Sequence, residues 1–299
     1  MSTLCRDLFT LLKLSIYTRR EIIDVELIII EGYFYFSYEG EPMQIIPIGT
    51  SRLHEPMSLL QTHEACFLQC GYVHSSGQVL DLLKILVGEI DITSEQSRWF
   101  FRKDQTPSNP FDVRLWSSEE LSEAVDAMRK RWNECSACII EICTPRTYIL
   151  DGINVQGNPN IERNVSYAEI WKDGYYKTYE PKLNVATFDE SELQISKNIE
   201  DICRILDTHN KLGLFLGHLV DPRNPHPVRS RNNATLKAAF DASGFGLVKY
   251  FDCSFFVEEY GFRILENGSQ DIHHLPWESL ESLAKSFEFT LETLIEKGN

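Results

Sequence analysis

Short apolar runs bounded by turn residues alternate along most of the chain with segments whose apolar residues recur at helical spacing. Five of these runs are predicted to be core strands, at residues 43–49, 66–73, 137–143, 212–220 and 246–251. Strands that alternate with helical segments are typical of a parallel sheet covered by helices on both faces. The pattern therefore predicts a three-layer α/β domain built on a five-stranded parallel sheet.

The helix candidates between the strands have recognisable starts and ends. Ser117 and Glu120 have the spacing of a capping box at the start of a helix over residues 117–132. Two further helices are predicted over residues 191–206 and 231–244, the second ending at a glycine that suits a C-cap. The last helix is predicted to begin near Trp277.

Two stretches do not fit this alternation. Residues 8–17 have the pattern of an amphipathic docking helix too short to span a bilayer, and residues 22–42 that of an antiparallel hairpin. Residues 145–185, rich in Tyr, Asn and Gly, are predicted to form an inserted hairpin after the third strand. We therefore expect an N-terminal helix and hairpin extension at residues 1–42 and an α/β domain at 43–299 that contains the insertion.

Charge and cysteine content narrow the classes of partner. With 29 Lys and Arg against 44 Asp and Glu, the formal charge is -15, which disfavours nucleic acid and an anionic membrane surface. Eight cysteines without a cleavable leader favour reduced thiols and a cytoplasmic location. Cys135 and Cys138 form a lone C-x-x-C, for which buried structural thiols are favoured over a metal or redox site. No metal site is predicted.

Two polar blocks lie at opposite ends of the α/β domain. Gly49-Thr50-Ser51 follows the first core strand, at the carboxyl end where α/β folds place their ligands. Asp271, His273 and His274 stand just before the last helix, either as a polar helix entry or as part of a hydrolytic site. A serine hydroxyl needs an imidazole to take its proton, and the imidazole needs a carboxylate to orient it.

These blocks resemble those of the SGNH/GDSL hydrolase superfamily, in which a serine follows the first strand and an Asp-x-x-His block lies near the C-terminus. The resemblance implies an SGNH-like, flavodoxin-like fold, with Ser51 as nucleophile, His274 as general base and Asp271 as its orienting carboxylate. Thr50 stands where the family has aspartate, and the family's Gly-x-Asn-Asp block does not follow the third strand. The candidates for the oxyanion hole are therefore Asn154, in Gly152-Ile-Asn154, and the backbone N–H groups of Ser51, Gly71 and Gly77.

Other polar residues have both a structural and a functional interpretation. His74 and His218 end the second and fourth strands, where they either line the cleft or belong to loops. Arg52 follows the serine and either meets an anionic group on a substrate or forms a surface ion pair. Arg229 and Arg231 either clamp an anion or lie in a solvated loop, and His273 competes with His274 as base.

The resemblance implies hydrolysis of an ester, or movement of an acyl group onto or off a carbohydrate, because related proteins occur in polysaccharide biosynthesis. One alternative is an acyltransferase that uses acyl-coenzyme A, whose phosphates the segment around Arg229 would hold; no other cofactor is expected. A second alternative is a non-catalytic binding module. The aromatic residues of the insertion suit sugar stacking, packing of the hairpin, or a contact between copies of the chain in a homo-oligomer; they are Tyr167, Trp171, Tyr175, Tyr176 and Tyr179.

Overall fold

The computed structural model describes residues 10–17, 22–30 and 33–37, and then residues 41–298 except 69, 71, 95, 98–116 and 156–184. Its centre is a five-stranded sheet in the order β11-β10-β6-β4-β5, with every neighbouring pair parallel. Taken in chain order the strands are arranged 2-1-3-4-5, the flavodoxin-like order that was expected. The strands are β4 (Gln44–Ile48), β5 (Glu64–Ala65), β6 (Ala137–Glu141), β10 (Leu212–Leu216) and β11 (Val248–Phe251).

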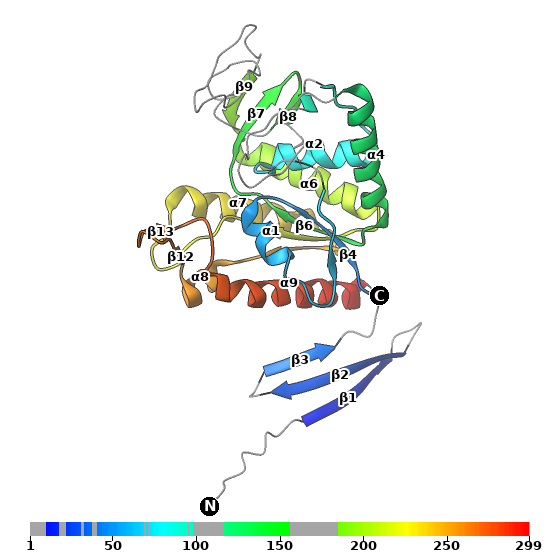
Figure 1. The fold of residues 1–299 in the computed structure, drawn as a ribbon, viewed down its shortest axis with the longest axis vertical. Coiled ribbons are helices and arrows are strands. Elements are labelled where there is room, and N and C mark those ends of the chain that lie inside the picture. The colour runs from blue at the N-terminus through cyan, green and yellow to red at the C-terminus, as the bar shows by residue number, and fades with distance from the viewer. Residues whose placement is uncertain are drawn as a thin grey trace, which may run out of the picture.

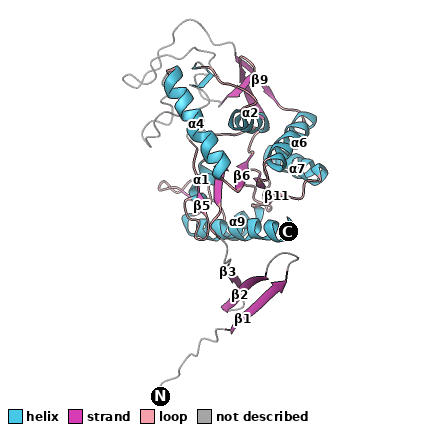
Figure 2. Ribbon diagram, turned by 90° about the vertical axis from the view of Figure 1, so that its right-hand side faces the viewer, coloured by secondary structure: helices cyan, strands magenta, loops and turns pink. Residues whose placement is uncertain are grey.

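Helices cover both faces of this sheet, because successive strand residues point to opposite sides (Figures 1 and 2). Ile46 and its neighbours on one face pack against α2, α4, α6 and α7, while Ile45 and its neighbours on the other face pack against α1, α8 and α9. The three-layer α/β fold is thus confirmed. The helices are α1 (Ser51–Met57), α2 (Ser76–Val87), α4 (Ser118–Glu134), α6 (Glu192–Thr208), α7 (Pro227–Ser243), α8 (Ser254–Tyr260) and α9 (Trp277–Gly298).

The local helix signals are confirmed where the structure describes them. Ser117 caps α4, and both hydrogen bonds of the capping box with Glu120 are formed. Gly244 ends α7 in the left-handed conformation, with φ of 70°. Helix α7 begins at Pro227, four residues earlier than predicted, because proline fits the first helical position.

The prediction of a strand over residues 66–73 is wrong. Pairing at this edge of the sheet is limited to β5, after which the N–H of Cys66 donates to the carbonyl of Ile45 at 2.7 Å and the chain leaves the sheet. Leu68 and Cys70 are buried without belonging to a strand. An apolar run indicates that its residues are buried, but not that they belong to a strand. At the edge of a sheet, a segment can be buried without forming a hydrogen-bonded ladder with the neighbouring strand.

The predicted N-terminal helix is also wrong. Residues Thr10–Tyr17 form strand β1, which pairs antiparallel with β2 (Ile22–Ile30), and β2 pairs with β3 (Tyr33–Ser37). The hairpin expected over residues 22–42 is confirmed as β2 and β3. Leu12, Leu14 and Ile16 repeat at a period of two, while Leu12 and Ile16 also have the i, i+4 spacing of a helix. Pairing with β2, which begins five residues after β1 ends, decides for the strand.

The insertion after β6 contains the expected hairpin. β7 (Arg146–Leu150) pairs antiparallel with β8 (Ile153–Val155) and with β9 (Val185–Asp189). The two residues of the β7–β8 turn, Asp151 and Gly152, have φ of 48° and 86°, as a two-residue hairpin turn of the primed type requires. The aromatic residues proposed for sugar stacking lie outside the described residues.

Within the described residues, no helix is long and apolar enough to cross a membrane. The seven cysteines of that part of the chain form no disulfide with one another, and Cys5 lies outside it. Nor do His, Cys, Asp and Glu side chains gather there in threes or more around a common point where a metal ion could bind.

Candidate active site

The serine block and the Asp-x-x-His block reach the same edge of the sheet from opposite ends of the domain. Ser51 is the first residue of α1, directly after β4, and the extended backbone of Thr50 turns the chain into that helix. Asp271 ends β13 (Gln270–Asp271), which forms a small hairpin with β12 (Arg263–Ile264) ahead of α9. The loop after this hairpin carries His274.

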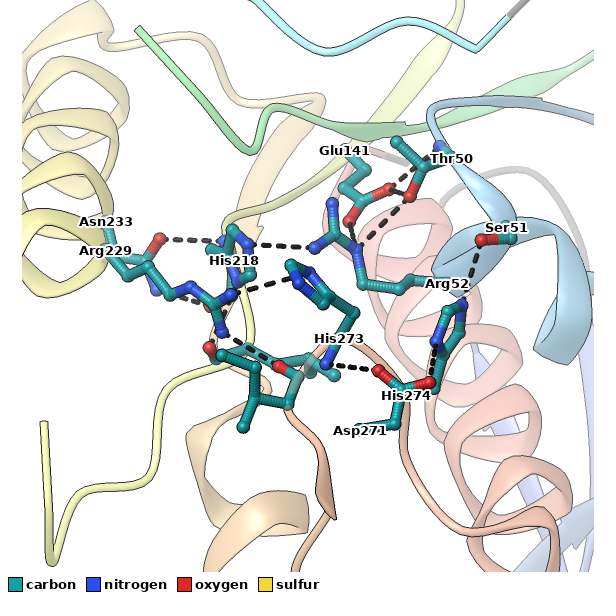
Figure 3. A network of polar contacts seen from close by, with 12 residues as sticks. Thr50, Ser51, Arg52, Glu141, His218, Arg229, Asn233, Asp271, His273 and His274 are labelled. Atoms are coloured by element: carbon teal, nitrogen blue, oxygen red, sulfur yellow. Dashed lines mark hydrogen bonds and ion pairs between the residues drawn. The ribbon is translucent and has the colours of Figure 1, made fainter. Parts of the chain in front are cut away.

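Ser51, His274 and Asp271 form a continuous hydrogen-bonded chain (Figure 3). Ser51 Oγ lies 2.9 Å from His274 Nε2, and His274 Nδ1 lies 2.7 Å from Asp271 Oδ2. A carboxylate can only accept, so Nδ1 carries the proton and Nε2 is left to accept from the serine hydroxyl. His274, and not His273, is the histidine that reaches Ser51.

Asp271 is held in its charged form. Burial alone would raise the pKa of Asp271, but hydrogen bonds from the His273 backbone N–H, at 3.0 Å, and from the His274 ring lower it overall. The side chains of His274 and Asp271 remain 20% and 18% exposed, so these two residues lie at a surface that a substrate can approach.

Glu141, which the sequence analysis did not single out, organises the backbone around the serine. It ends β6, is 2% exposed, and accepts at Oε2 from the N–H and the hydroxyl of Thr50, at 2.9 and 2.6 Å. Gly49 leaves room for it, because a Cβ there would lie 2.7 Å from Glu141 Cβ. A charged residue within the apolar run 137–143 was the one available signal.

Arg52 forms a buried ion pair next to the serine. Its Nε lies 2.6 Å from Glu141 Oε1, and the Arg52 and Glu141 side chains are 9% and 3% exposed. Burial alone would lower the pKa of Arg52, but the Glu141 carboxylate raises it. The expected surface ion pair is wrong because the pair is buried, whereas a contact between Arg52 and a substrate stays a prediction.

His218 extends the same network as a neutral ring. Burial, together with the charges of Arg52 and Arg229, lowers the pKa of His218 to about 2. Its Nε2 therefore accepts from Arg52 Nη1 at 2.9 Å, and its Nδ1–H donates to the Leu219 carbonyl at 3.1 Å. Asn233, also missed by the sequence analysis, accepts from the backbone N–H of His218 at 2.8 Å and donates to its carbonyl at 2.7 Å.

Arg229 and His273 form the outer side of this network (Figure 3). Arg229 Nη1 donates to the carbonyl of Ile272 at 2.8 Å, and its Nη2 lies 3.4 Å from His273 Nδ1. Burial and the nearby Arg229 lower the pKa of His273, which favours its neutral, accepting form. Arg231 is exposed on α7, and no hydrogen bond or ion pair links it to the described residues of the site.

Two of the other oxyanion candidates, Gly77 and Asn154, have partners away from Ser51. The N–H of Gly77 donates to Glu190 Oε1 at 2.8 Å, and the Asn154 side chain donates to Asp81 and accepts from Thr147, so both groups serve to fix the insertion to α2. Gly71 lies outside the described residues. His74 does lie at the carboxyl edge of the sheet, where its carbonyl accepts from the N–H groups of Cys143 and Thr144.

The class of protein follows from three features. They are a parallel sheet in this strand order, a serine after its first strand, and an Asp-x-x-His block before the last helix. The chain is an α/β protein that resembles the SGNH/GDSL hydrolases, as the sequence indicated. Residues 43–169, less than half of the chain, match the family model described as the TviD N-terminal domain. No curated protein matches the chain.

Three solved structures show the following similarity. A crystal structure of TesA is 15% identical with a TM-score of 0.33, and the match covers 84% of this chain and 99% of TesA. The psychrotrophic esterase EstA from Pseudoalteromonas sp. is 11% identical with a TM-score of 0.32, covering 84% and 96%. The acetyl xylan esterase Est2A from the rumen bacterium Butyrivibrio proteoclasticus is 12% identical with a TM-score of 0.31, covering 92% and 71%.

Proposed function

We propose that the protein is a serine-dependent acyl-transfer enzyme, which hydrolyses an ester or moves an acyl group onto a hydroxyl acceptor. The observation that carries this proposal is the chain from Ser51 Oγ through His274 to Asp271, with heavy-atom distances of 2.9 and 2.7 Å. Each of these contacts is within the range for a nucleophile paired with its base and a base paired with its orienting group.

The first half of the reaction follows from this geometry. Ser51 Oγ attacks the carbonyl carbon of the acyl donor while His274 Nε2 takes the hydroxyl proton, and Asp271 stabilises the resulting imidazolium. The tetrahedral intermediate collapses when His274 returns the proton to the leaving oxygen, and the acyl group stays on Ser51. The backbone N–H of Ser51, in the first turn of α1 where intrahelical acceptors are lacking, is our candidate to stabilise the oxyanion.

The second half decides between hydrolysis and transfer. His274 would deprotonate either water or an acceptor hydroxyl, which then attacks the acyl-serine. We retain a carbohydrate hydroxyl as the proposed acceptor, as the resemblance to polysaccharide-biosynthesis proteins implies. A hydroxyl acceptor that competes with water would lower the yield of free acid without lowering donor consumption.

An acyl-coenzyme A donor is less well supported by the contacts in the structure. Arg229, proposed to hold its phosphates, already directs two nitrogens at the loop that carries His273 and His274. Release of free thiol from acetyl-coenzyme A by the purified protein would restore this alternative.

The test is turnover of an activated acetyl ester by alanine variants. Because Ser51 and His274 act as a unit, either single variant and the double variant should lose nearly the same activity, roughly 1,000-fold or more. Asp271→Ala should lose less, since the base remains. His273→Ala is the matched control, one residue away, and should lose least.

Two measurements serve as controls for this test. Circular dichroism should show that every variant keeps its fold, and a fluorophosphonate probe should label the wild type but not Ser51→Ala. Full activity in Ser51→Ala would remove the nucleophile from the mechanism. A folded wild-type protein that neither turns over the ester nor reacts with the probe would favour a non-catalytic binding module.

A further inference from the structure

The reactive pair Ser51 and His274 is 223 positions apart in the chain and lies on two different elements. One hydrogen bond of 2.9 Å joins the two side chains directly. A hydroxyl and an imidazole at a partly exposed edge cannot hold α1 and the loop after β13 in register by themselves, because a single exposed hydrogen bond contributes only about 1 kcal/mol. Some other contact must fix their separation.

Arg263, on β12, contacts both elements. Its backbone N–H donates to the carbonyl of His274 at 2.9 Å, and its Nε donates to the carbonyl of Leu275 at 3.1 Å. Its Nη1 and Nη2 donate to Glu55 Oε1 and Oε2, at 3.2 and 2.5 Å. Arg263 therefore contacts the loop that carries His274 and Leu275, which we call the base loop, through its backbone N–H and Nε. It contacts α1, the helix that carries Ser51, through Nη1 and Nη2.

Glu55 is well placed to transmit this contact. It lies four residues after Ser51 on α1, one turn along the same face of the helix. The bridge is bidentate, which fixes direction as well as distance. The Arg263 and Glu55 side chains are 13% and 22% exposed, so solvent screens the bridge less than a surface pair.

Trp277 shields the other side of the bridge. The Arg263 guanidinium carbon lies 3.9 Å from the centre of a Trp277 ring, in a cation–π contact at the start of α9. Trp277 itself remains 63% exposed. Three segments, α1, the base loop and the start of α9, thus meet at one guanidinium.

We propose that Arg263 is a positioning residue, which through Glu55 sets the separation of Ser51 Oγ and His274 Nε2 in the reactive arrangement. This inference rests on the proposed acyl-transfer function. Neither residue touches the reacting atoms, so the effect should fall on the chemical step and not on binding of the donor. A displacement of about 1 Å at a reactive pair costs up to roughly 100-fold in rate.

The test uses Arg263→Met, Glu55→Gln and their combination, assayed for kcat and KM on the activated acetyl ester. Each single variant should lower kcat by about 10-fold to 100-fold and leave KM within about 2-fold. Because both act through one bridge, the double variant should be no worse than Arg263→Met alone. Arg263→Lys, which keeps the charge but has one donor nitrogen in place of three, should recover part of the loss.

Arg146→Met is the control, since Arg146 pairs with Asp189 at 3.0 Å in the insertion, away from Ser51. It should leave kcat unchanged. Labelling by the fluorophosphonate measures the fraction of folded, reactive protein, so that kcat is expressed per active site. If Arg263→Met and Glu55→Gln lower the unfolding temperature but keep the wild-type kcat per active site, the bridge is structural only and the proposal is overturned.

A second readout does not depend on turnover. In the wild type, the ring N–H proton that His274 shares with Asp271 should exchange slowly and give a downfield NMR signal. In Glu55→Gln this proton should exchange faster, whereas Arg146→Met should match the wild type. A wild type without turnover or labelling would contradict the proposed function, whereas an unchanged His274 signal in Glu55→Gln would contradict the positioning role.

Discussion

Removal of Glu141 tests the buried network beneath the serine most directly. Its Oε2 accepts two hydrogen bonds from Thr50, and its Oε1 lies 2.6 Å from Arg52 Nε. Because the Arg52 side chain is only 9% exposed, Glu141→Ala leaves a guanidinium buried without its counter-charge. Breaking a buried pair in this way costs about 3–5 kcal/mol of unfolding free energy.

A variant that removes both charges distinguishes an unpaired buried charge from a loss of packing. Glu141→Leu combined with Arg52→Met removes both charges and fills most of the volume. Thr50 loses its acceptor in both variants, so this loss cancels in the comparison. The double variant adds one unpaired acceptor, His218 Nε2, which costs about 1–3 kcal/mol. The double variant should therefore lose less stability than Glu141→Ala, although it changes two residues.

Urea unfolding at pH 7, followed by circular dichroism, measures both free energies. The ester assay should show a lower kcat in Glu141→Ala as well, since Thr50 no longer fixes the residue before Ser51. A loss below about 1 kcal/mol in Glu141→Ala, or a larger loss in the double variant than in the single, would refute the reasoning.

Two further predictions concern the same network. Gly49→Ala should lose about 1–3 kcal/mol of unfolding free energy, because its Cβ would lie 2.7 Å from that of Glu141. In the control Gly246→Ala, whose Cβ would have no atom within 4 Å, the unfolding free energy should change by less than about 0.5 kcal/mol. Equal losses in the two variants, measured by urea unfolding, would contradict this prediction. His218 has a folded pKa of about 2 against 6.5 for a free histidine, so below pH 6.5 the unfolded chain binds a proton that the folded chain does not. As the pH is lowered below 6.5, this residue should therefore reduce the unfolding free energy by up to about 1.4 kcal/mol per pH unit. His218→Gln should make the unfolding free energy depend less on pH between 6.5 and 4. Parallel curves for the wild type and His218→Gln would show that His218 does not titrate in this way.

Several features were predictable from the sequence because their energetics are local. The capping box of Ser117 and Glu120 and the glycine end of α7 each involve groups within a few residues of one another. Four of the five core strands were located. Three of them, β4, β6 and β10, are buried along almost their whole length and therefore form continuous apolar runs, whereas the edge strand β11 carries an exposed Lys249. The Asp271–His274 contact also belongs here, since three residues of spacing allow it within one turn of chain.

The contact between Ser51 and His274 was a hypothesis from the sequence. It forms because the fold brings together two residues that are 223 positions apart. Placing the two blocks at strand ends on one edge followed from the parallel topology, but the distance depends on how α1 and the base loop pack. Their catalytic roles stay predictions until Ser51→Ala and His274→Ala are measured.

Tertiary structure alone decided the partners of the other candidates. Arg52 and Asn154 have side chains that suit a substrate or an oxyanion equally well, and only the fold places Glu141 beside Arg52 and Asp81 beside Asn154. The same holds for β1, whose period-two and helical patterns coincide until β2 supplies a ladder. Sequence patterns record which residues are buried and how the chain turns locally, whereas the free energy of a polar contact depends on a partner that folding brings from elsewhere in the chain.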